Sequence, residues 1–445
     1  MTRSVTVGVL SLHSSKETKA ILNTINELGH DGVWLREENL VIDIDDGVVT
    51  IEPDVDVIVN RLLLSKTEQP SELLGLAKSL GGRRPMLNRP ENVLTAFHKF
   101  ATATAMGDTD VRVPDALLAL DADRLNRERA DFGEEAVYKT AIGTHGGGTW
   151  KIGPGETVNP RVGDRFAFLQ ELIEQDEEKR HSDLRIYVVD DEIVAAMNRF
   201  APENDWRTNV ALGGDVEGVT DIPDAAATMA LDAAEALGLD YAGVDLVRGT
   251  DGWYLLEVNP TAGFKGLFRA TGVNPAPHIA KVAIETGGGT VDPDAIERLE
   301  GVLDDSMPKD VPRQTAVTEE RRRTIGYTEE VLVSGTSGTE RVVAKSDTGA
   351  SRTSIDTRLG ATIGAGPIKS MTKVKSGSVK SGKARPVVDI VVGIGGDRHT
   401  VAASLEDRGH MEYPLLLGRD ILQGYSVDVR RRAEDEAETA PDREE

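Results

Sequence analysis

Two short apolar runs near the middle of the chain, residues 244–247 and 253–258, are each interrupted by one carboxylate. The turn between them is rich in glycine, so the pair is typical of a β-hairpin. Side chains alternate along a strand, which places Glu257 and Asn259 on one face. If the hairpin puts Asp245 opposite them, two carboxylates and an amide oxygen converge. Hard oxygen ligands of this kind suit Mg²⁺, which takes its other ligands from water and substrate phosphates.

A plainer alternative is an exposed hairpin on which Asp245 and Glu257 are ordinary polar positions. The apolar residues on both sides of each acid argue against this alternative, because an unpaired charge in apolar surroundings is costly. We therefore expect a metal site formed by Asp245, Glu257 and Asn259.

The first 90 residues alternate between β-prone and helical patterns. Strands are expected at residues 5–12, 33–35 and 55–60, and helices at residues 15–28 and 73–80. This alternation predicts a small α/β domain with a parallel sheet.

Two lysines stand out in the next segment. A helix is expected over residues 91–106, carrying Lys99, and a strand over residues 136–140, carrying Lys139. A glycine-rich turn follows at residues 143–148. A lysine just before such a turn fits phosphate binding, because glycines let backbone N–H groups approach the oxygens while the lysine neutralises charge. The spacing is not that of a P-loop, and a glycine run by itself is also typical of a hairpin tip.

Composition excludes several classes of protein. A chain of 445 residues is too long for one core, so two or three domains are expected. The absence of cysteine excludes disulfides, thiolate nucleophiles and cysteine-ligated metals. The net charge of −24 argues against nucleic-acid binding, and no apolar run is long enough to span a membrane. The N-terminus does not fit a secretory signal, so a cytoplasmic protein is expected.

The order of motifs over residues 85–285 resembles the ATP-grasp superfamily, and within it the RimK-type carboxylate–amine ligases. The matching segments are Asn88-Arg89-Pro90, Lys99, Lys139 with residues 143–148, residues 170–173, Asp183-Leu184-Arg185, residues 194–199, residues 205–209, residues 243–246 and Glu257-Val258-Asn259.

The resemblance implies ATP clamped between two α+β subdomains, with two Mg²⁺ or Mn²⁺ ions held by Asp245, Glu257 and Asn259. Arg199 and Arg207 would act near the γ-phosphate. The implied nucleotide-binding residues are Lys99, Lys139, Gly143, Thr144, Gly146, Gly147, Gly148, Gln170, Glu171, Leu172, Ile173, Asp183, Arg185, Arg207, Thr208 and Asn209. In this family ATP converts a carboxylate to an acyl phosphate, which an amine then attacks. Such phosphoryl transfer needs positioning and charge neutralisation more than covalent help from the protein.

The sequence departs from the family's pattern in two places. The segment between Gln170 and Asp183 is longer and more acidic than the usual turn, and residues 260–263 replace the usual Ser-Pro-Gly after the metal-binding asparagine. The second region usually shapes the acceptor side, so the acceptor is left open between a small molecule, a peptide and a protein tail. Glutamate is the amine that the family often uses.

The last module, residues 325–430, differs in pattern and charge. It consists of short β-prone runs separated by turns, which is typical of a small barrel. Residues 331–430 hold 14 Lys and Arg against 10 Asp and Glu, whereas the whole chain is acidic. An isolated Asp-Thr-Gly is a common turn. Paired with the later apolar run that ends at Gly418-Arg419, the one at Asp347 resembles the retropepsin-like aspartic proteases, and more closely the ATP-dependent zinc proteases associated with RimK ligases. Zinc itself has no support, because His399 and His410 are isolated and cysteine is absent.

Aspartic proteases use two carboxylates that share one proton, because two neighbouring carboxylates cannot both ionise. The chain has one Asp-Thr-Gly, so Asp347 would be catalytic only across the two-fold axis of a homodimer.

We therefore expect an α/β plus α+β protein with a C-terminal all-β barrel. The expected parts are an N-terminal parallel-sheet subdomain at 1–88, a two-subdomain ATP-grasp domain at 89–286, a linker at 287–324, a retropepsin-like domain at 325–430 and an acidic tail at 431–445.

The expected function is ATP- and Mg²⁺-dependent ligation of a carboxylate to an amine, in a homo-oligomer. Two alternatives remain: a peptide hydrolase that acts through the C-terminal domain, and a C-terminal domain that binds peptides without cutting them.

Overall fold

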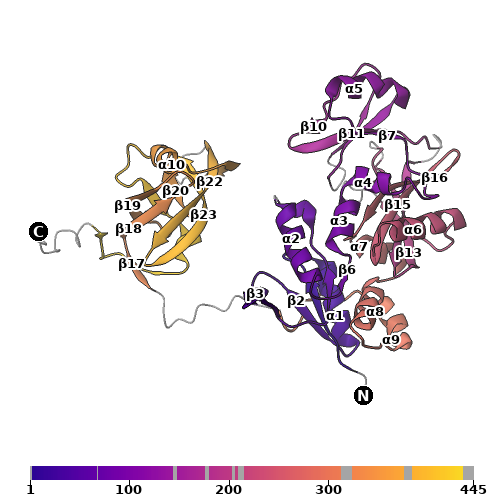
Figure 1. Cartoon of the computed structure of the whole chain (residues 1–445), viewed down its shortest axis with the longest axis horizontal. Helices are drawn as coiled ribbons and strands as arrows, with labels where there is room; N and C mark the ends of the chain where they lie inside the picture. The colour runs from indigo at the N-terminus through magenta and orange to yellow at the C-terminus, as the bar shows by residue number, and fades with distance from the viewer. Residues whose placement is uncertain are drawn as a thin grey trace, which may run out of the picture. The chain divides into compact units, whose positions relative to one another are not determined.

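The computed structural model describes residues 3–67, 69–143, 148–175, 180–202, 206–208, 215–311, 323–374 and 383–433. The chain divides into two compact units, residues 1–314 and 315–445 (Figure 1). Among the described residues, no helix is both long enough and apolar enough to cross a membrane.

The first unit begins with a parallel sheet in the order β2-β1-β5-β6, as the alternating pattern predicts. Ser15 starts the first helix, because its hydroxyl accepts a hydrogen bond from the Thr18 backbone N–H at 3.0 Å. A two-stranded hairpin that the sequence analysis did not foresee, β3 with β4, follows the second strand. The elements are β1 (Thr6–Leu10), α1 (Lys16–Glu27), β2 (Asp31–Leu35), β3 (Val41–Asp45), β4 (Val48–Glu52), β5 (Val57–Asn60), α2 (Pro70–Gly81) and β6 (Met86–Leu87).

Two antiparallel sheets follow. The smaller has the order β10-β11-β8-β9, with β7 on β11, and the larger has the order β14-β13-β12-β15-β16. Their strands are β7 (Ala116–Leu117), β8 (Ala136–Thr140), β9 (Thr149–Ile152), β10 (Arg161–Val162), β11 (Arg165–Glu171), β12 (Ser182–Val189), β13 (Glu192–Phe200), β14 (Asp215–Val219), β15 (Tyr241–Gly249) and β16 (Gly252–Asn259). Helix α5 (Ala122–Arg127) lies beside the smaller sheet (Figure 1).

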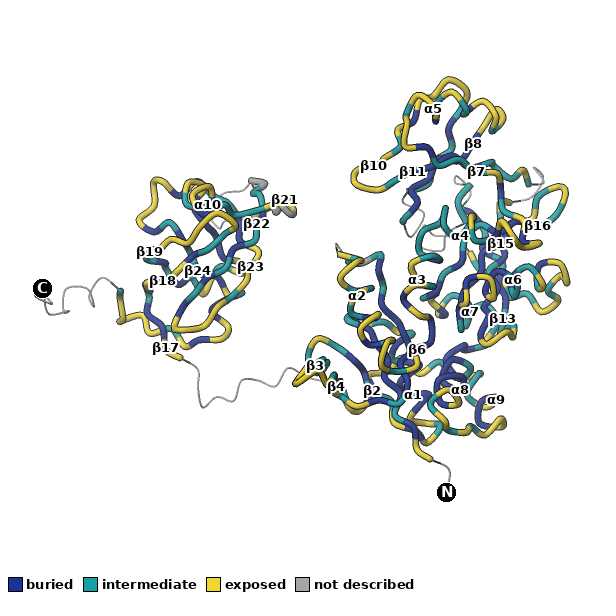
Figure 2. Tube along the Cα trace, viewed as in Figure 1, coloured by how far each residue is buried: buried dark blue, intermediate teal, exposed yellow. Residues whose placement is uncertain are grey.

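The two faces of the larger sheet have different partners. Helix α6 (Asp224–Ala236) packs its alanines against Leu184 and Ile186 of β12. On the other face, Tyr187 and Met197 share a core with Phe264, α7 (Lys265–Thr271) and the N-terminal helix α1. Figure 2 shows buried residues running through these elements. Because side chains alternate along β12, Asp183 and Arg185 lie on the same face as Tyr187, away from α6.

The helix expected over residues 91–106 is two helices, α3 (Pro90–Phe97) and α4 (Lys99–Ala105). The chain leaves helical geometry at His98, whose Nδ1 accepts a hydrogen bond from the Ala101 backbone N–H at 3.1 Å. The Lys99 N–H is thereby free to donate to the Ala141 carbonyl at 2.8 Å, just beyond β8. Periodicity alone did not reveal this break, because both helices bury apolar residues at helical spacing.

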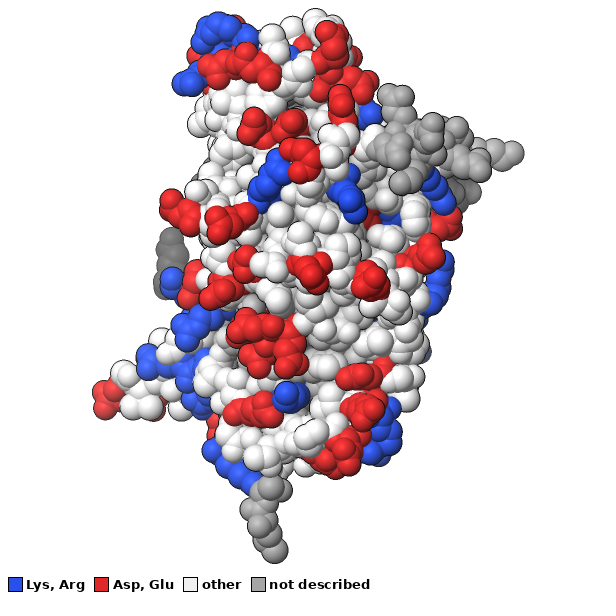
Figure 3. Space-filling view, turned by 90° about the vertical axis from the view of Figure 1, so that its right-hand side faces the viewer, with Lys and Arg blue, Asp and Glu red and all other residues white. Residues whose placement is uncertain are grey.

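Two further helices complete the first unit. Helix α8 (Ala276–Thr286) packs against α1, and α9 (Pro293–Glu300) packs against α8. Helix α9 lies within the stretch expected as a linker and buries Ala295 and Ile296. Figure 3 shows acidic side chains spread over one face of the molecule among fewer basic ones, in keeping with the acidic composition.

The second unit contains a closed six-stranded barrel, β18-β19-β24-β20-β23-β22, in which β22 returns to pair with β18. The expected small β barrel is confirmed, with Val331, Ile355, Val388 and Leu415 among its core residues. The elements are β17 (Thr324–Gly326), β18 (Thr328–Ser334), β19 (Thr339–Ser346), β20 (Ser354–Asp356), α10 (Thr357–Ile363), β21 (Ile368–Val374), β22 (Lys383–Ile394), β23 (Asp397–Glu406), β24 (Leu415–Leu417), α11 (Arg419–Leu422) and β25 (Ser426–Asp428).

Candidate active site

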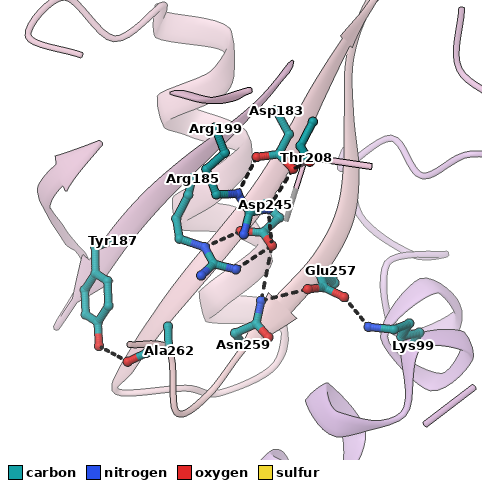
Figure 4. Close-up of polar contacts among 10 residues, drawn as sticks. All are labelled: Lys99, Asp183, Arg185, Tyr187, Arg199, Thr208, Asp245, Glu257, Asn259 and Ala262. Carbon is teal, nitrogen blue, oxygen red and sulfur yellow. Dashed lines mark hydrogen bonds and ion pairs between the residues drawn. The ribbon is translucent and has the colours of Figure 1, made fainter. Parts of the chain in front are cut away.

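The hairpin expected from the apolar runs at residues 244–247 and 253–258 is formed by β15 and β16. Asp245 and Glu257 are directly opposite each other in its register. The Asn259 Nδ2 donates to Asp245 Oδ2 at 3.3 Å and to Glu257 Oε1 at 3.2 Å (Figure 4). The structure thus brings the three predicted metal-binding side chains together on one face of the larger sheet.

Two arginines from neighbouring strands surround Asp245. Arg185 of β12 is its register partner and binds both carboxylate oxygens at 2.6 Å. Arg199 of β13 binds Asp183 at 2.6 and 2.7 Å and reaches Asp245 at 2.8 Å. Thr208 also donates to Asp183. The charges of Arg199, Asp183, Arg185 and Asp245 therefore alternate across β13, β12 and β15, and each of the four has an opposite partner, whereas Glu257 on β16 is a second acid beside Asp245.

Two lysines approach from other elements. Lys99, at the start of α4, forms an ion pair with Glu257. Burial raises the pKa of Glu257, but the charge and hydrogen bond of Lys99 outweigh it and hold that pKa well below its usual range. Lys139 of β8 is only 6% exposed. Its pKa is lowered to about 7, first by burial and then by repulsion from Lys99.

A cavity of about 510 Å³ connects these groups. The predicted site residues that line it are Lys99, Lys139, Gly143, Gly148, Gln170, Glu171, Leu172, Ile173, Asp183, Arg185, Arg199, Arg207, Thr208, Asp245, Glu257 and Asn259. Thr144, Gly146, Gly147 and Asn209 lie outside the described residues. Asp347 belongs to the second unit.

The predicted adenine-binding segment runs along one wall of the cavity. Gln170 and Glu171 end β11, and Leu172 and Ile173 follow them. The Glu171 backbone N–H is already used, because it donates to the Asp115 carbonyl at 2.8 Å. Next to this wall, the carbonyl of Gly148 accepts from the Thr140 N–H at 2.9 Å, which closes the base of the glycine-rich turn.

The chemistry of the donor set fits Mg²⁺. In the described part of the chain, no three His, Cys, Asp or Glu side chains cluster closely enough to hold a metal. Two carboxylates and an amide are nevertheless enough for Mg²⁺, which keeps waters and substrate phosphates as ligands. Glu257 accepts one hydrogen bond on each oxygen, which leaves lone pairs available. Asp245 accepts four, so it fits Mg²⁺ once Arg185 or Arg199 releases an oxygen.

Of the residues that the structure describes, seven in the N-terminal subdomain line the cavity and were not predicted, namely Ser15, Glu17, Arg61, Leu62, Leu63, Leu64 and Ser65. Arg61 follows directly on β5. The carboxyl ends of parallel strands are where open α/β sheets bind ligands, so its position after a predicted strand was the available signal.

In the second unit, Asp347 follows β19 and lies in a tight loop. Its Oδ1 accepts from the backbone N–H groups of Gly349 at 2.9 Å and Ala350 at 3.2 Å. Arg419 holds the loop from α11 by donating to the Thr348 carbonyl at 3.2 Å. The carboxylate is therefore fixed in direction, and its loop is exposed at Thr348 and Gly349.

Comparison with known proteins finds a matching family for each of the two units of the chain. Residues 156–283 match the RimK-like ATP-grasp domain, and residues 362–436 match the retropepsin-like aspartic endopeptidase RimB. The first match therefore does not include Lys99 or Lys139, and the second does not include Asp347.

Curated relatives are similar over the first unit. The tetrahydromethanopterin:alpha-L-glutamate ligase of Methanocaldococcus jannaschii is 34% identical over 211 residues, which cover 45% of this chain and 70% of that protein. A protein of Stenotrophomonas maltophilia named "Probable alpha-L-glutamate ligase" is 31% identical over 231 residues, covering 51% and 77%.

Among solved structures, the ATP-grasp ligase PsnB, in complex with a phosphomimetic variant of its minimal precursor, Mg and ADP, has a TM-score of 0.51. The alignment covers 63% of this chain and 98% of PsnB at 19% identity, which supports the ATP-grasp fold. Together with the sequence relatives, these matches show that the chain belongs to the RimK-like ATP-grasp ligase family, among the relatives of alpha-L-glutamate ligases, and carries a RimB-like retropepsin domain.

Proposed function

We propose that the first unit joins a carboxylate to the amine of an amino acid such as glutamate, using ATP and Mg²⁺ and passing through an acyl phosphate. The observation that carries the proposal is the charge ladder, the row of charged side chains on the face of the larger sheet that lines the cavity. Arg199, Asp183, Arg185, Asp245 and Glu257 come from four adjacent strands and line one cavity with Lys99 and Lys139.

The cationic side chains are suited to polyphosphate. Lys139 is buried in the cavity wall, so an anion beside it interacts in a medium of low dielectric constant. Arg199 is held rigidly by two carboxylates, which fixes the direction of its remaining N–H groups. We assign Lys99, Lys139 and Arg199 to charge neutralisation, with Arg207 as a further cationic residue of the cavity.

Glu257, Asn259 and Asp245 would hold Mg²⁺. The metal supplies neutralisation of phosphate oxygens and orients the group that is transferred. The protein's own part is to position these oxygens: Lys99 holds one oxygen of Glu257, and Asn259 bridges the two carboxylates.

The test is a search for amide products. Purified protein is incubated with ATP, Mg²⁺, each amino acid and a panel of carboxylate acceptors, and ADP release and product mass are recorded. The panel includes peptides, because the PsnB structures contain precursor peptides. ADP release that requires both an amino acid and an acceptor supports ligation. ADP release that is unaffected by either, with no new amide, contradicts it.

We propose a second activity for the C-terminal barrel, peptide hydrolysis by a homodimer in which two copies of Asp347 face each other. It is favoured by the fixed carboxylate in its exposed loop and by the similarity of residues 362–436 to RimB. In the alternative function, the barrel would bind a peptide at the same surface without cutting it. We also propose that the chain acts in the cytoplasm and that the barrel is a domain distinct from the first unit, within which the N-terminal sheet and the ATP-grasp domain share a core.

A further inference from the structure

Arg61 is a buried arginine whose hydrogen-bonding capacity is largely unused. Its side chain lines the cavity, and the residue is only 2% exposed. Within the described residues, its Nε and Nη1 are buried and have no hydrogen-bond partner. Nη2 donates to the carbonyls of Thr261 at 3.4 Å and Ala262 at 3.5 Å, which are long contacts. Buried donors without partners are unfavourable, so such a group calls for an explanation.

Other buried arginines of the same unit behave differently. Arg129 is 5% exposed and donates to the carbonyls of Gly133, Glu134 and Ile152 at 2.8 to 3.0 Å. Arg199 is bound to two carboxylates. In the part of the chain that the structure describes, Arg129 leaves only its Nε without a partner, whereas Arg61 leaves both Nε and Nη1.

The orientation of Arg61 is set by aromatic side chains, whose hydroxyls at Tyr187 and Tyr241 also interact with it. Its guanidinium carbon lies 5.6 Å from the centre of the Phe264 ring and 5.9 Å from that of Tyr241. Both rings belong to the core that joins the N-terminal sheet to the larger sheet. The guanidinium is therefore fixed in a largely apolar wall, where an incoming anion meets little competition from water.

Glu17, in the first turn of α1, lines the same cavity. Its Oε1 lies 3.2 Å from the position that a Cβ on Gly263 would take, so it is beside the segment that Arg61 contacts. In the described part of the chain Glu17 forms no ion pair with Arg61. One end of the cavity thus presents a cation and an anion that do not neutralise each other, an arrangement that suits a ligand carrying both charges.

We propose that Arg61 binds a carboxylate of the amino-acid substrate that does not itself react, with Glu17 favouring substrates that also carry an amino group. This inference rests on the proposed ligase function. It makes Arg61 a substrate-binding residue supplied by the N-terminal sheet, which precedes in sequence the strands that carry the proposed nucleotide-binding residues. Bidentate binding of a carboxylate uses Nε and Nη2, as in the Arg185–Asp245 pair. At Arg61 one carboxylate oxygen would take the unpartnered Nε, and the other would replace the long contacts of Nη2.

The variants Arg61→Met and Arg61→Lys test the proposal, with Arg36→Met as the matched control. Arg36 also lies over an aromatic ring, at 4.7 Å from the centre of Trp34, and also has an unpartnered Nε, but it does not line the cavity. In steady-state assays with L-glutamate, Arg61→Met is expected to raise the KM for the amino acid by about 30-fold. In Arg61→Met, the kcat and the KM for ATP should change by less than about threefold. The KM for the amino acid in Arg61→Lys should lie between those of the wild-type protein and Arg61→Met.

Calorimetry provides a readout that does not depend on turnover. L-Glutamate, and glutarate as a dicarboxylate without an amino group, are titrated into the full chain with Mg²⁺ and a non-hydrolysable ATP analogue. We expect L-glutamate to bind the wild-type protein and the Arg36→Met variant alike and the Arg61→Met variant about 30-fold more weakly. Glutarate binds the wild-type protein more weakly than L-glutamate because of Glu17.

The outcomes separate this inference from the proposed function. The role of Arg61 is refuted, and the ligase function stands, if wild-type protein forms amides but Arg61→Met leaves the KM for the amino acid unchanged. The same conclusion follows if Arg61→Met raises the KM for ATP as much as the KM for the amino acid. If no amide forms with any amino acid, the proposed ligase function fails. The calorimetric titrations of L-glutamate and glutarate then decide whether Arg61 binds a carboxylate. Failure of the wild-type protein to bind any amino acid or glutarate overturns the inference as well.

Discussion

Arg185 and Asp245 are register partners on adjacent strands, and their side chains form a bidentate ion pair with both N–O distances at 2.6 Å. Asp245 also binds Arg199, so one buried carboxylate balances two guanidinium groups. The pair explains why a carboxylate within an apolar run is tolerated on β15. It also means that the aspartate that we assign to the metal stabilises the fold.

Asp245→Ala and Glu257→Gln are therefore expected to behave differently. Both should lower ligation by at least about 100-fold, because positioned charge is central to phosphoryl transfer. Asp245→Ala leaves Arg185 without its carboxylate partner and Arg199 with Asp183 alone, and it should lower the free energy of unfolding by about 3–5 kcal/mol. Glu257→Gln removes the charged partner of Lys99 at a side chain that is 29% exposed, so it should lower the free energy of unfolding by less than Asp245→Ala does. Urea unfolding and ADP release measure the two effects.

The exposed Glu72→Gln on α2 serves as a control that should change neither quantity. Near wild-type turnover in Glu257→Gln, with unchanged Mg²⁺ dependence, would contradict the metal assignment.

Lys139 should make the stability of the ligand-free protein depend on pH. Its pKa is lowered to about 7, whereas an unfolded lysine titrates near pH 10.4. Between these values the unfolded chain binds one proton more than the folded chain. The free energy of unfolding should therefore rise with pH through this window, by up to about 1.4 kcal/mol per pH unit, and the gain is lost as pH falls through 7. Chemical denaturation at several pH values, compared between wild type and Lys139→Met, measures the slope.

Lys151→Met on the neighbouring strand β9 is the control for Lys139, since its amine is 26% exposed and pairs with Glu135. The Lys139→Met variant should also bind ATP more weakly while acceptor binding is retained. Equal pH slopes in the wild-type protein, Lys139→Met and Lys151→Met would contradict a buried amine at Lys139. Unchanged ATP affinity in Lys139→Met, measured by calorimetry, would show that Lys139 does not face the nucleotide.

Phe264 should be essential for joining the N-terminal sheet to the larger sheet. Its ring is fully buried and meets the Tyr187 ring edge-on at a centroid distance of 5.7 Å. Phe264→Ala should lower the free energy of unfolding by about 3–5 kcal/mol, because it leaves a cavity in this core. A loss below about 1 kcal/mol in urea unfolding would indicate that the two sheets are held together by other contacts.

Asp347→Asn should abolish any peptide hydrolysis and leave ADP release unchanged, because Asp347 lies in the second unit and the ladder lies in the first. Hydrolysis should require a dimer, since one carboxylate cannot form the shared-proton pair. Peptidase assays combined with light scattering at the same protein concentration test this. Hydrolysis by a strictly monomeric sample would refute the paired site.

Local sequence determined the parts of this protein that depend on the period of one element. Alternation along β16 is enough to put Glu257 and Asn259 on one face. The turn before it brings β15 alongside, but a register shift between Asp245 and Leu246 is also needed to place Asp245 opposite Glu257 rather than Leu256. The parallel sheet and the barrel were likewise predictable, because runs of strands and helices have characteristic patterns.

Only the tertiary structure decided which distant side chains meet those carboxylates. The ion pairs of Asp245 depend on the order of strands in the sheet, and the lysine pair of Glu257 depends on the break at His98. Arg61 lies in the site because an aromatic core joins the N-terminal sheet to the larger one. Strand order, helix breaks and packing between sheets result from contacts between residues far apart in the chain, and no spacing within a single segment contains them.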